Sequence, residues 1–330
     1  MQIVSPDPSS RSVGRGIARH TMFMVSGLFA LASAQLTQAQ AAASGAPAAP
    51  TPPPYSLPWQ LRPAAAATVL RSDTAFAFYK DPMTDESGMS VPSFLLGSYK
   101  VTPEFAPMMR VGAIHNSPPE VMGKSVSGFV LTNPLFGGTY VFKLSPELRL
   151  ATFLGFTLPV GGGGGNMPKA SSAAARNSGL LARSGMDNAM FAVNDFTIIP
   201  GLDFAYVAHG FTAQIEATLF QLTRALGDKV QKDASRTNFT AGLHLGYFFI
   251  PQLSLGAELR YQRWLSTPAN VKMDMTGTLR DTLSMAVGLR VHIKAGSTWL
   301  RPGLAYARGL DAPMSKSAYN ILQLDVPVQF

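Results

Sequence analysis

The chain has 330 residues, which is enough for one large β domain or two ordinary ones, and it contains no cysteine. Only 14% of its residues are charged and 46% are hydrophobic, yet beyond the N-terminus no apolar run is long enough to cross a bilayer as a helix. The formal charge of +8 includes three arginines that precede an N-terminal apolar run, and no basic block is interleaved with aromatic residues, which argues against nucleic-acid binding.

The first segment has the pattern of a secretory signal peptide. Three arginines between residues 11 and 19 precede the apolar residues 22–32, and small residues follow. Cleavage after Ala41 or after Ala34 would leave small residues at the −3 and −1 positions. The alternative is an uncleaved anchor helix, for which the apolar run is short. We assign residues 1–41 to the signal peptide.

Residues 42–67 are rich in alanine and proline, a composition that cannot bury enough apolar surface to become ordered. We predict a flexible periplasmic leader here and a membrane barrel over residues 68–330. In the barrel region apolar and polar residues alternate with a period of two, most clearly over residues 283–294. No amphipathic helix of suitable length is available to cover the apolar face, so we expect that face to contact lipid.

Counting such segments gives about twelve strands, at residues 68–80, 91–102, 105–115, 126–144 with a break near Asn133-Pro134, 147–158, 194–208, 211–225, 236–250, 252–266, 279–294, 297–310 and 318–330. Short connections alternate with long ones. This alternation is typical of outer-membrane barrels, which have short periplasmic turns, longer outer loops and an even number of strands. We therefore predict an all-β, antiparallel, up-and-down transmembrane barrel in the bacterial outer membrane, with both chain ends in the periplasm.

The last strand separates an apolar face from a polar one. Its apolar face consists of Leu322, Leu324, Val326, Val328 and Phe330. This pattern resembles the C-terminal strand of bacterial outer-membrane barrels, which characteristically ends in phenylalanine and is recognised by their assembly machinery. A soluble β-sandwich can also end this way, but the alternation along the rest of the chain favours the barrel. The resemblance implies outer-membrane lipids and the barrel-assembly machinery as partners.

The polar faces of the strands predict the residues that line the lumen. They are Arg149, Asp203, Glu216, His244, Glu258, Arg260, Arg290, His292, Lys294, Arg301 and Asp325. These side chains form a hydrated pore lining in one interpretation, and pair with one another merely to satisfy the interior in the other. Four of the basic residues, which flank one short turn, lack an obvious acidic match, so we expect them to favour anions at the periplasmic mouth.

The long connection over residues 159–193 starts with a run of glycines, but no Gly-Lys-Ser/Thr follows, which excludes a phosphate-binding loop of that type. Its alanine-rich middle, residues 170–182, predicts a short helix that folds over or into the barrel. We favour a constriction or a lid. A mobile outer loop tethered by glycines is the alternative.

A possible catalytic pair lies in the stretch Gly112–Ser117. It resembles the Gly-x-x-His-x-Ser arrangement of outer-membrane phospholipase A, which implies His115 as the base and Ser117 as the nucleophile. The family pattern continues with Asn-Gly, whereas Pro118 and Pro119 follow here, so this chain departs from the pattern directly after the serine. The other histidines have no metal-ligand spacing, and we predict no cofactor and no metal.

Together, the signal peptide, the strand count and the terminal phenylalanine resemble the broad group of bacterial outer-membrane transporters that includes the phenol meta-pathway outer-membrane proteins. The first hypothesis is a monomeric porin-like channel for small solutes that prefers anions and is not an enzyme. The rival hypotheses are a lipid-modifying hydrolase on the same fold, and a plugged barrel with a structural or adhesive role.

Overall fold

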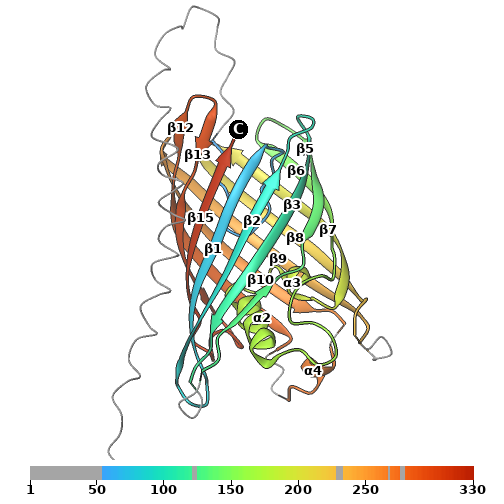
Figure 1. Cartoon of the computed structure of the whole chain (residues 1–330). Coiled ribbons are helices and arrows are strands. Elements are labelled where there is room, and N and C mark those ends of the chain that lie inside the picture. The colour runs from blue at the N-terminus through green and yellow to red at the C-terminus, as the bar shows by residue number, and fades with distance from the viewer. Residues whose placement is uncertain (1–53, 121–124, 228–232, 267, 276–278) are drawn as a thin grey trace, which may run out of the picture. The chain divides into compact units, whose positions relative to one another are not determined.

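The computed structural model describes residues 54–120, 125–227, 233–266, 268–275 and 279–330. These residues form a closed antiparallel barrel (Figure 1), in which β1 (Val69–Lys80) pairs with β15 (Asn320–Gln329) to close the ring. The other strands are β2 (Ser87–Ser98), β3 (Phe105–Ser117), β4 (Gly128–Leu131), β5 (Leu135–Lys143), β6 (Leu148–Thr157), β7 (Asp195–Ala208), β8 (Phe211–Arg224), β9 (Ser235–Ile250), β10 (Leu253–Trp264), β11 (Asp281–Val291), β12 (Ile293–Ala295), β13 (Thr298–Leu300) and β14 (Gly303–Gly309).

The labelled strands make up twelve strand positions around the barrel wall, here called staves, which confirms the predicted strand number and antiparallel topology. Three staves are each split into two strands: β4 with β5, β11 with β12, and β13 with β14. The break between β4 and β5 falls at the predicted position, because Pro134 lacks a ladder donor and Asn133 is fully buried. Strand β2 is displaced by four residues from its predicted range and runs from Ser87 to Ser98. It ends before Val101 because that residue already belongs to the turn, where its backbone N–H donates to the carbonyl of Phe105 (3.0 Å).

The outer face of the barrel is apolar. Large side chains such as Leu154 and Leu202 point outward and are more than half exposed. Tyr140 packs against Phe142, and Tyr247 against Phe249, on the outside near the ends of their strands. An apolar band with aromatic residues at its border is what a barrel presents to the hydrocarbon and interface of a membrane.

The two ends of the barrel differ in their connections. At one end, here called the turn end, short links such as residues 209–210 and 251–252 join the strands, and Phe330 lies there. The opposite loop end carries longer connections, including residues 158–194 and the short helix α4 (Ala269–Lys272) (Figure 1). Among the described residues, no helix is both long and apolar enough to span a membrane.

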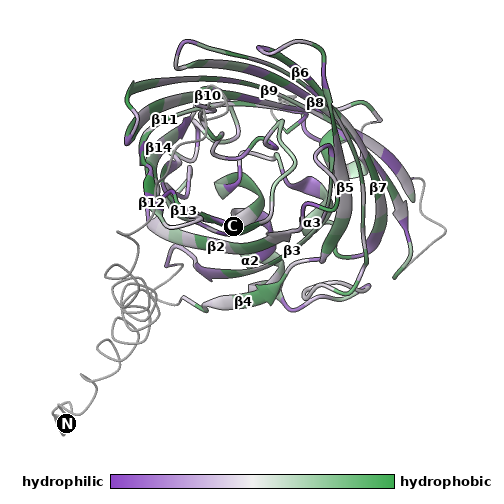
Figure 2. Ribbon diagram, turned by 90° about the horizontal axis from the view of Figure 1, so that it is seen from above, coloured by the Kyte–Doolittle hydropathy of each residue, from purple (hydrophilic) through white to green (hydrophobic). Residues whose placement is uncertain are grey.

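Residues 54–67, here called the N-terminal segment, lie inside the barrel. We predicted a flexible leader over residues 42–67, and the part that the structure describes instead dips into the lumen from the turn end and returns to β1 (Figure 2). Trp59 and Leu61 are each only 1% exposed. The segment is ordered because a few large side chains among its alanines and prolines contact residues of the barrel wall. The predicted signal peptide and the start of the leader lie outside the described residues.

Helix α2 (Ala170–Ala182) has the predicted bounds and folds into the barrel from the loop end (Figure 1). Its buried positions are Ala175, Ser178, Gly179 and Ala182, the spacing of one helical face. Small residues on this face let the helix approach the wall closely, and Ser178 donates a hydrogen bond to Asn116 of β3 (2.8 Å). A short helix α3 (Asn188–Phe191) follows and is fully buried. The helical part of the connection therefore folds into the barrel and is not a mobile outer loop, and its role as a constriction or a lid stays a prediction.

Candidate functional site

The lumen of the barrel is occupied by two insertions. The N-terminal segment enters from the turn end, and residues 170–191, here called the α2 insertion, enter from the loop end. Viewed along the barrel axis, chain segments lie inside the ring of strands (Figure 2). The space left for a solute in the lumen therefore depends on the contacts that hold these two insertions.

Carboxylates of the wall hold the N-terminal segment. The backbone N–H of Trp59 donates to Glu258, and the N–H of Gln60 donates to the same carboxylate (3.1 Å). Arg62 forms ion pairs with Asp203 (3.4 Å) and Glu216 (3.3 Å). These carboxylates, predicted to line a pore, thus bind the chain's own N-terminal segment.

Glycines on the inner wall make room for this segment. A Cβ atom added to Gly303 would lie 2.6 Å from the Trp59 ring, and one added to Gly242 would lie 2.7 Å from Leu61. Both distances are shorter than van der Waals contact, so even alanine at these positions would displace the segment. The guanidinium carbon of Arg290 also lies 4.5 Å from the centre of the Trp59 ring, which holds the ring from another side.

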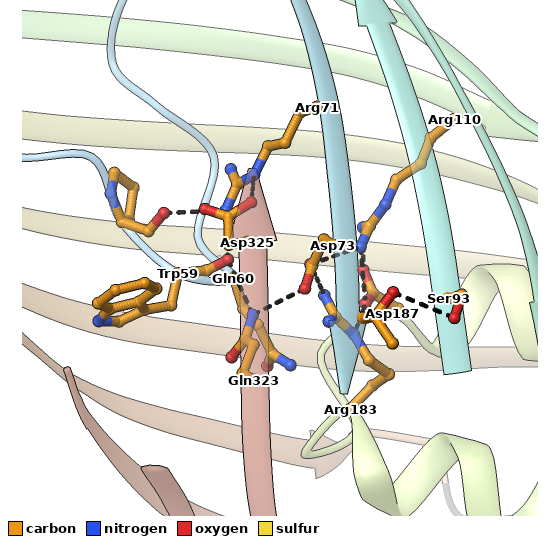
Figure 3. A network of polar contacts seen from close by, with 12 residues as sticks. Trp59, Gln60, Arg71, Asp73, Ser93, Arg110, Arg183, Asp187, Gln323 and Asp325 are labelled. Atoms are coloured by element: carbon orange, nitrogen blue, oxygen red, sulfur yellow. Dashed lines mark hydrogen bonds and ion pairs between the residues drawn. The ribbon is translucent and has the colours of Figure 1, made fainter. Parts of the chain in front are cut away.

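Arginines and a loop carboxylate hold the α2 insertion (Figure 3). Asp187 accepts hydrogen bonds from Arg110 of β3 (2.6 Å) and from Arg183, directly after α2 (2.8 Å). Arg183 also pairs with Asp73 of β1 (2.8 Å). Burial alone would raise the pKa of Asp187, but the two guanidinium groups hold it below its usual value. Asp187 is therefore a carboxylate that stabilises the insertion in its ionised form.

The predicted lumen residues fall into two groups. A buried group lies inside the barrel, each member less than a tenth exposed: Asp203, Glu216, His244, Glu258, Arg260, Arg290, His292 and Asp325. The prediction that Arg290 lacks an acidic match is wrong, because its side chain donates to Asp325 (2.5 Å) from across an intervening strand. Arg260 also has an acidic partner, Glu258 (2.8 Å), which lies two residues away on the same strand, β10.

The other group, Arg149, Lys294 and Arg301, lies at the turn end and is here called the mouth cluster. Within the described part of the chain, none of the three pairs with a carboxylate. They lie over aromatic rings instead: Arg149 over Tyr55 (5.4 Å), and both Lys294 (5.7 Å) and Arg301 (5.3 Å) over Trp299. The mouth cluster thus carries positive charge that is not engaged in an ion pair within the described ranges.

A cavity of about 920 Å³ connects these features. Its wall includes the mouth cluster, both insertions and an apolar surface formed by side chains such as Phe94, Phe153 and Phe220. Two arginines lie over its aromatic rings, Arg110 over Phe94 (4.4 Å) and Arg62 over Phe153 (4.7 Å). A compact solute with an apolar body and a negative group would find complementary surfaces here.

The suggested catalytic pair lies away from the cavity. His115 and Ser117 share the outward face of β3, and His115 Nε2 lies 3.4 Å from the hydroxyl of Ser117. In the part of the chain that the structure describes, no carboxylate or amide is seen to hydrogen-bond the other ring nitrogen of His115. A base in a catalytic triad needs such an orienting partner. No group of three or more His, Asp or Glu side chains suited to a metal ion occurs within the described ranges either.

The sequence reading missed several residues that hold the insertions. These are Arg62, Arg71, Asp73, Arg110, Arg183, Asp187 and Gln323. For the members on strands, the period-two pattern could have found them: Arg71 and Asp73 alternate with outward positions on β1 and share the inner face with Ala75 and Ala77. Arg62 and Asp187 carried no such signal, because they lie outside the strands.

Comparisons with known proteins bear on the fold. No family model matches the chain, and no curated protein matches it either. An outer-membrane channel from Pseudomonas putida matches at 13% identity, covering 82% of this chain and 98% of that one, with a TM-score of 0.51. The KdgM porin (10% identity, 79% and 99% covered, TM-score 0.43) and the NanC porin (7%, 78% and 98%, 0.46) are more distant in fold. The Pseudomonas channel and this chain share the fold of an outer-membrane barrel.

Proposed function

We propose that this protein is an outer-membrane channel for small anionic solutes, held closed by its two insertions. The observation that carries the proposal is the mouth cluster, whose three cations border the cavity and have no acidic partner in the described ranges. Cations at a pore mouth raise the local concentration of anions and favour their entry. The anionic solute would enter at the turn end and occupy the cavity once the N-terminal segment has moved.

The pairing of the lumenal acids supports anion preference. Asp203 and Glu216 share Arg62, and Asp325 is shared by Arg71 (2.7 Å) and Arg290, so that three carboxylates are matched by three arginines. Paired charges largely cancel at a distance, so the lumenal acids oppose the positive charge of the mouth cluster only weakly. Arg290, which the sequence places with the mouth residues, contributes little because Asp325 matches its charge.

The test is the reversal potential of the purified protein in planar bilayers under a salt gradient. We expect anion preference in the parent, and a shift toward zero when Arg149, Lys294 and Arg301 are all replaced by glutamine. The matched control is Arg263→Gln, because Arg263 is an exposed arginine at the loop end that pairs with Asp281 (3.4 Å). The preference should weaken as salt is raised, since the Debye length is about 10 Å at 0.1 M. Cation preference, or a reversal potential unmoved by the triple change, would contradict the proposal.

The topology follows from the same proposal. Outer-membrane barrels place short turns in the periplasm, so we place the turn end, the N-terminal segment and Phe330 there. The apolar last strand then fits recognition by the barrel-assembly machinery from the periplasmic side.

A second candidate, a lipid hydrolase, has one observation in its favour. His115 and Ser117 approach to 3.4 Å on the outward face of the barrel, where a lipid could reach them. Without an orienting partner for His115 this arrangement is incomplete, so we rank it below the channel.

A further inference from the structure

We propose that Asp73 and Gln323 act as positioning residues that form one joint between the two insertions, so that the N-terminal segment and the α2 insertion are released together. This inference rests on the proposed channel, because it says how the closed lumen would open. It assigns a role in closing the lumen to Asp73 on the first strand and Gln323 on the last strand. Neither residue touches the mouth cluster.

The side-chain amide of Gln323 joins the N-terminal segment to Asp73. Its Nε2 donates one hydrogen bond to the carbonyl oxygen of Trp59 (3.2 Å) and another to Oδ1 of Asp73 (3.0 Å) (Figure 3). Its Oε1 accepts from Arg260 (3.2 Å), which fixes the orientation of the amide. Both hydrogens of the amide are therefore used, one on each side of the joint.

The carboxylate of Asp73 continues the connection to the α2 insertion. Its Oδ2 lies 2.8 Å from Arg183 and 3.6 Å from Arg110. Arg183 is fully buried and follows directly after α2, so its position fixes the inner end of the helix. The path from Trp59 to Arg183 thus runs through Gln323 and Asp73 without a break.

Burial makes this joint cooperative. Gln323 is 0% and Asp73 4% exposed, so water cannot readily replace a partner that leaves. If Arg183 moves out, Asp73 becomes a buried carboxylate with weaker pairing, and its hydrogen bond with Gln323 changes with it. Loss of one insertion therefore weakens the hold on the other.

The joint is not the only anchor of either insertion. Glu258, Glu216 and Arg71 also hold the N-terminal segment, and Arg110 also holds the α2 insertion through Asp187. In the described ranges, Arg183 makes no hydrogen bond or ion pair with the N-terminal segment. An effect of Arg183 on that segment can therefore pass through the joint, through the apolar cluster that Trp59 shares with Ala182, or through general loosening of the barrel. Gln323→Met breaks the joint alone and so separates the first route from the other two.

The experiment uses the absence of cysteine in the chain. A single reporter cysteine is introduced either in the N-terminal segment (Ala64→Cys) or in α2 (Ala175→Cys), both buried alanines, and the rate of maleimide labelling of the purified, folded full chain is measured. We expect Asp73→Asn to raise the labelling rate at both positions by about tenfold or more, because it removes a buried ion-pair partner. The decisive arm is Arg183→Gln, which we expect to raise labelling at position 64, which it does not touch. Asp73→Glu, which keeps the charge, should restore part of the protection.

The matched control is Asp195→Asn. Asp195 is also a buried carboxylate paired with two arginines, Arg224 (3.0 Å) and Arg236, but it lies at the loop end, away from the joint. It should leave labelling at position 64 unchanged. If Asp73→Asn prevents folding, Gln323→Met tests the same joint with a side chain of similar size.

Two results would overturn the inference: no change at position 64 in Arg183→Gln, or an equal rise at position 64 in Asp195→Asn, which would mean general loosening. Labelling is measured without any current. A coupled joint in a barrel that never conducts would therefore refute the channel and leave the joint in place.

Discussion

Asp73 and Asp325 lie directly opposite each other in the register between β1 and β15, where the barrel closes. Like charges facing each other across two strands destabilise a sheet unless each has a partner. Here Asp325 forms ion pairs with Arg71 and Arg290, whereas Asp73 forms an ion pair with Arg183. One acid is thus satisfied by the wall and the other by the α2 insertion, so closure of the barrel and filling of its lumen depend on each other.

The wall side of this arrangement predicts a stability effect. Asp325→Asn should lower the free energy of unfolding by about 3 kcal/mol, because it leaves two buried arginines without their carboxylate. Unfolding in urea, followed by tryptophan fluorescence in detergent micelles, measures the change. Asp281→Asn is the control, since its pair with Arg263 is partly exposed to solvent and should contribute much less to stability. An equal fall in the free energy of unfolding in both variants would mean that the buried Asp325 ion pairs stabilise the barrel no more than the partly exposed pair does.

Acid should release the α2 insertion. The pKa of Asp187 is held below its usual value, and such a group contributes stability that is present above the unfolded-state pKa and lost as the pH falls through the folded-state pKa. The insertion should therefore stay in place from neutral pH down to about pH 4, the ordinary value for aspartate, and open below it. Single-channel recordings at decreasing pH should show openings that become more frequent only in that acid range.

In Asp187→Asn the neutral side chain has no such titration, so openings in this variant should be frequent already at neutral pH. If the parent opened with the same frequency at pH 7 and at the lowest pH at which the barrel stays folded, Asp187 would not be holding the insertion.

The terminal phenylalanine should matter for assembly. Phe330 is 64% exposed, and its backbone N–H donates to Thr68 (3.0 Å), so its ring contributes little to the folded barrel itself. We expect Phe330→Ala to lower the amount of heat-modifiable barrel in the outer membrane much more than it lowers synthesis. Leu304→Ala, which removes an exposed apolar side chain elsewhere on the outer face, should have little effect. Similar barrel yields in the parent and Phe330→Ala would argue against an assembly role.

The channel and hydrolase hypotheses predict opposite effects of substituting His115 and Ser117. We expect His115→Ala and Ser117→Ala to leave function unchanged, because Pro118 follows the serine and no group orients the histidine within the described ranges. Release of fatty acid from phospholipid vesicles by the purified protein is the measurement. Hydrolysis by the parent that both substitutions abolish would establish the enzyme.

Most of the wall could be predicted from the sequence, because side-chain alternation is a local property. The period-two pattern gave the strands, the break before Pro134 and the inward positions of Glu258 and Asp325. Residues 170–182 were expected as a helix from their alanine content, and that helix formed with the same bounds. Strand β2 was displaced by four residues because a turn at Val101 ended it early.

Pairing inside the lumen could not be predicted, because it depends on distances across the barrel. Arg290 and Asp325 lie on strands that flank β14, and their contact requires the twist and the register of three staves together. The N-terminal segment was missed for a different reason. Its average composition resembles a disordered linker, whereas its place in the lumen depends on Trp59 and Leu61 and on glycines far along the chain, such as Gly303.

The central claim is that the barrel is a channel held closed by its two insertions, and the conductance of single molecules that lack the N-terminal segment tests it most directly. Residues 55–66 are deleted, which leaves β1 intact, and folding is checked by heat modifiability. The parent is expected to show rare, small openings, and the deletion variant to show steady steps of larger conductance that carry anions. Identical currents in the two proteins, or no current in a folded deletion variant, would contradict the account and favour a barrel with a structural or adhesive role.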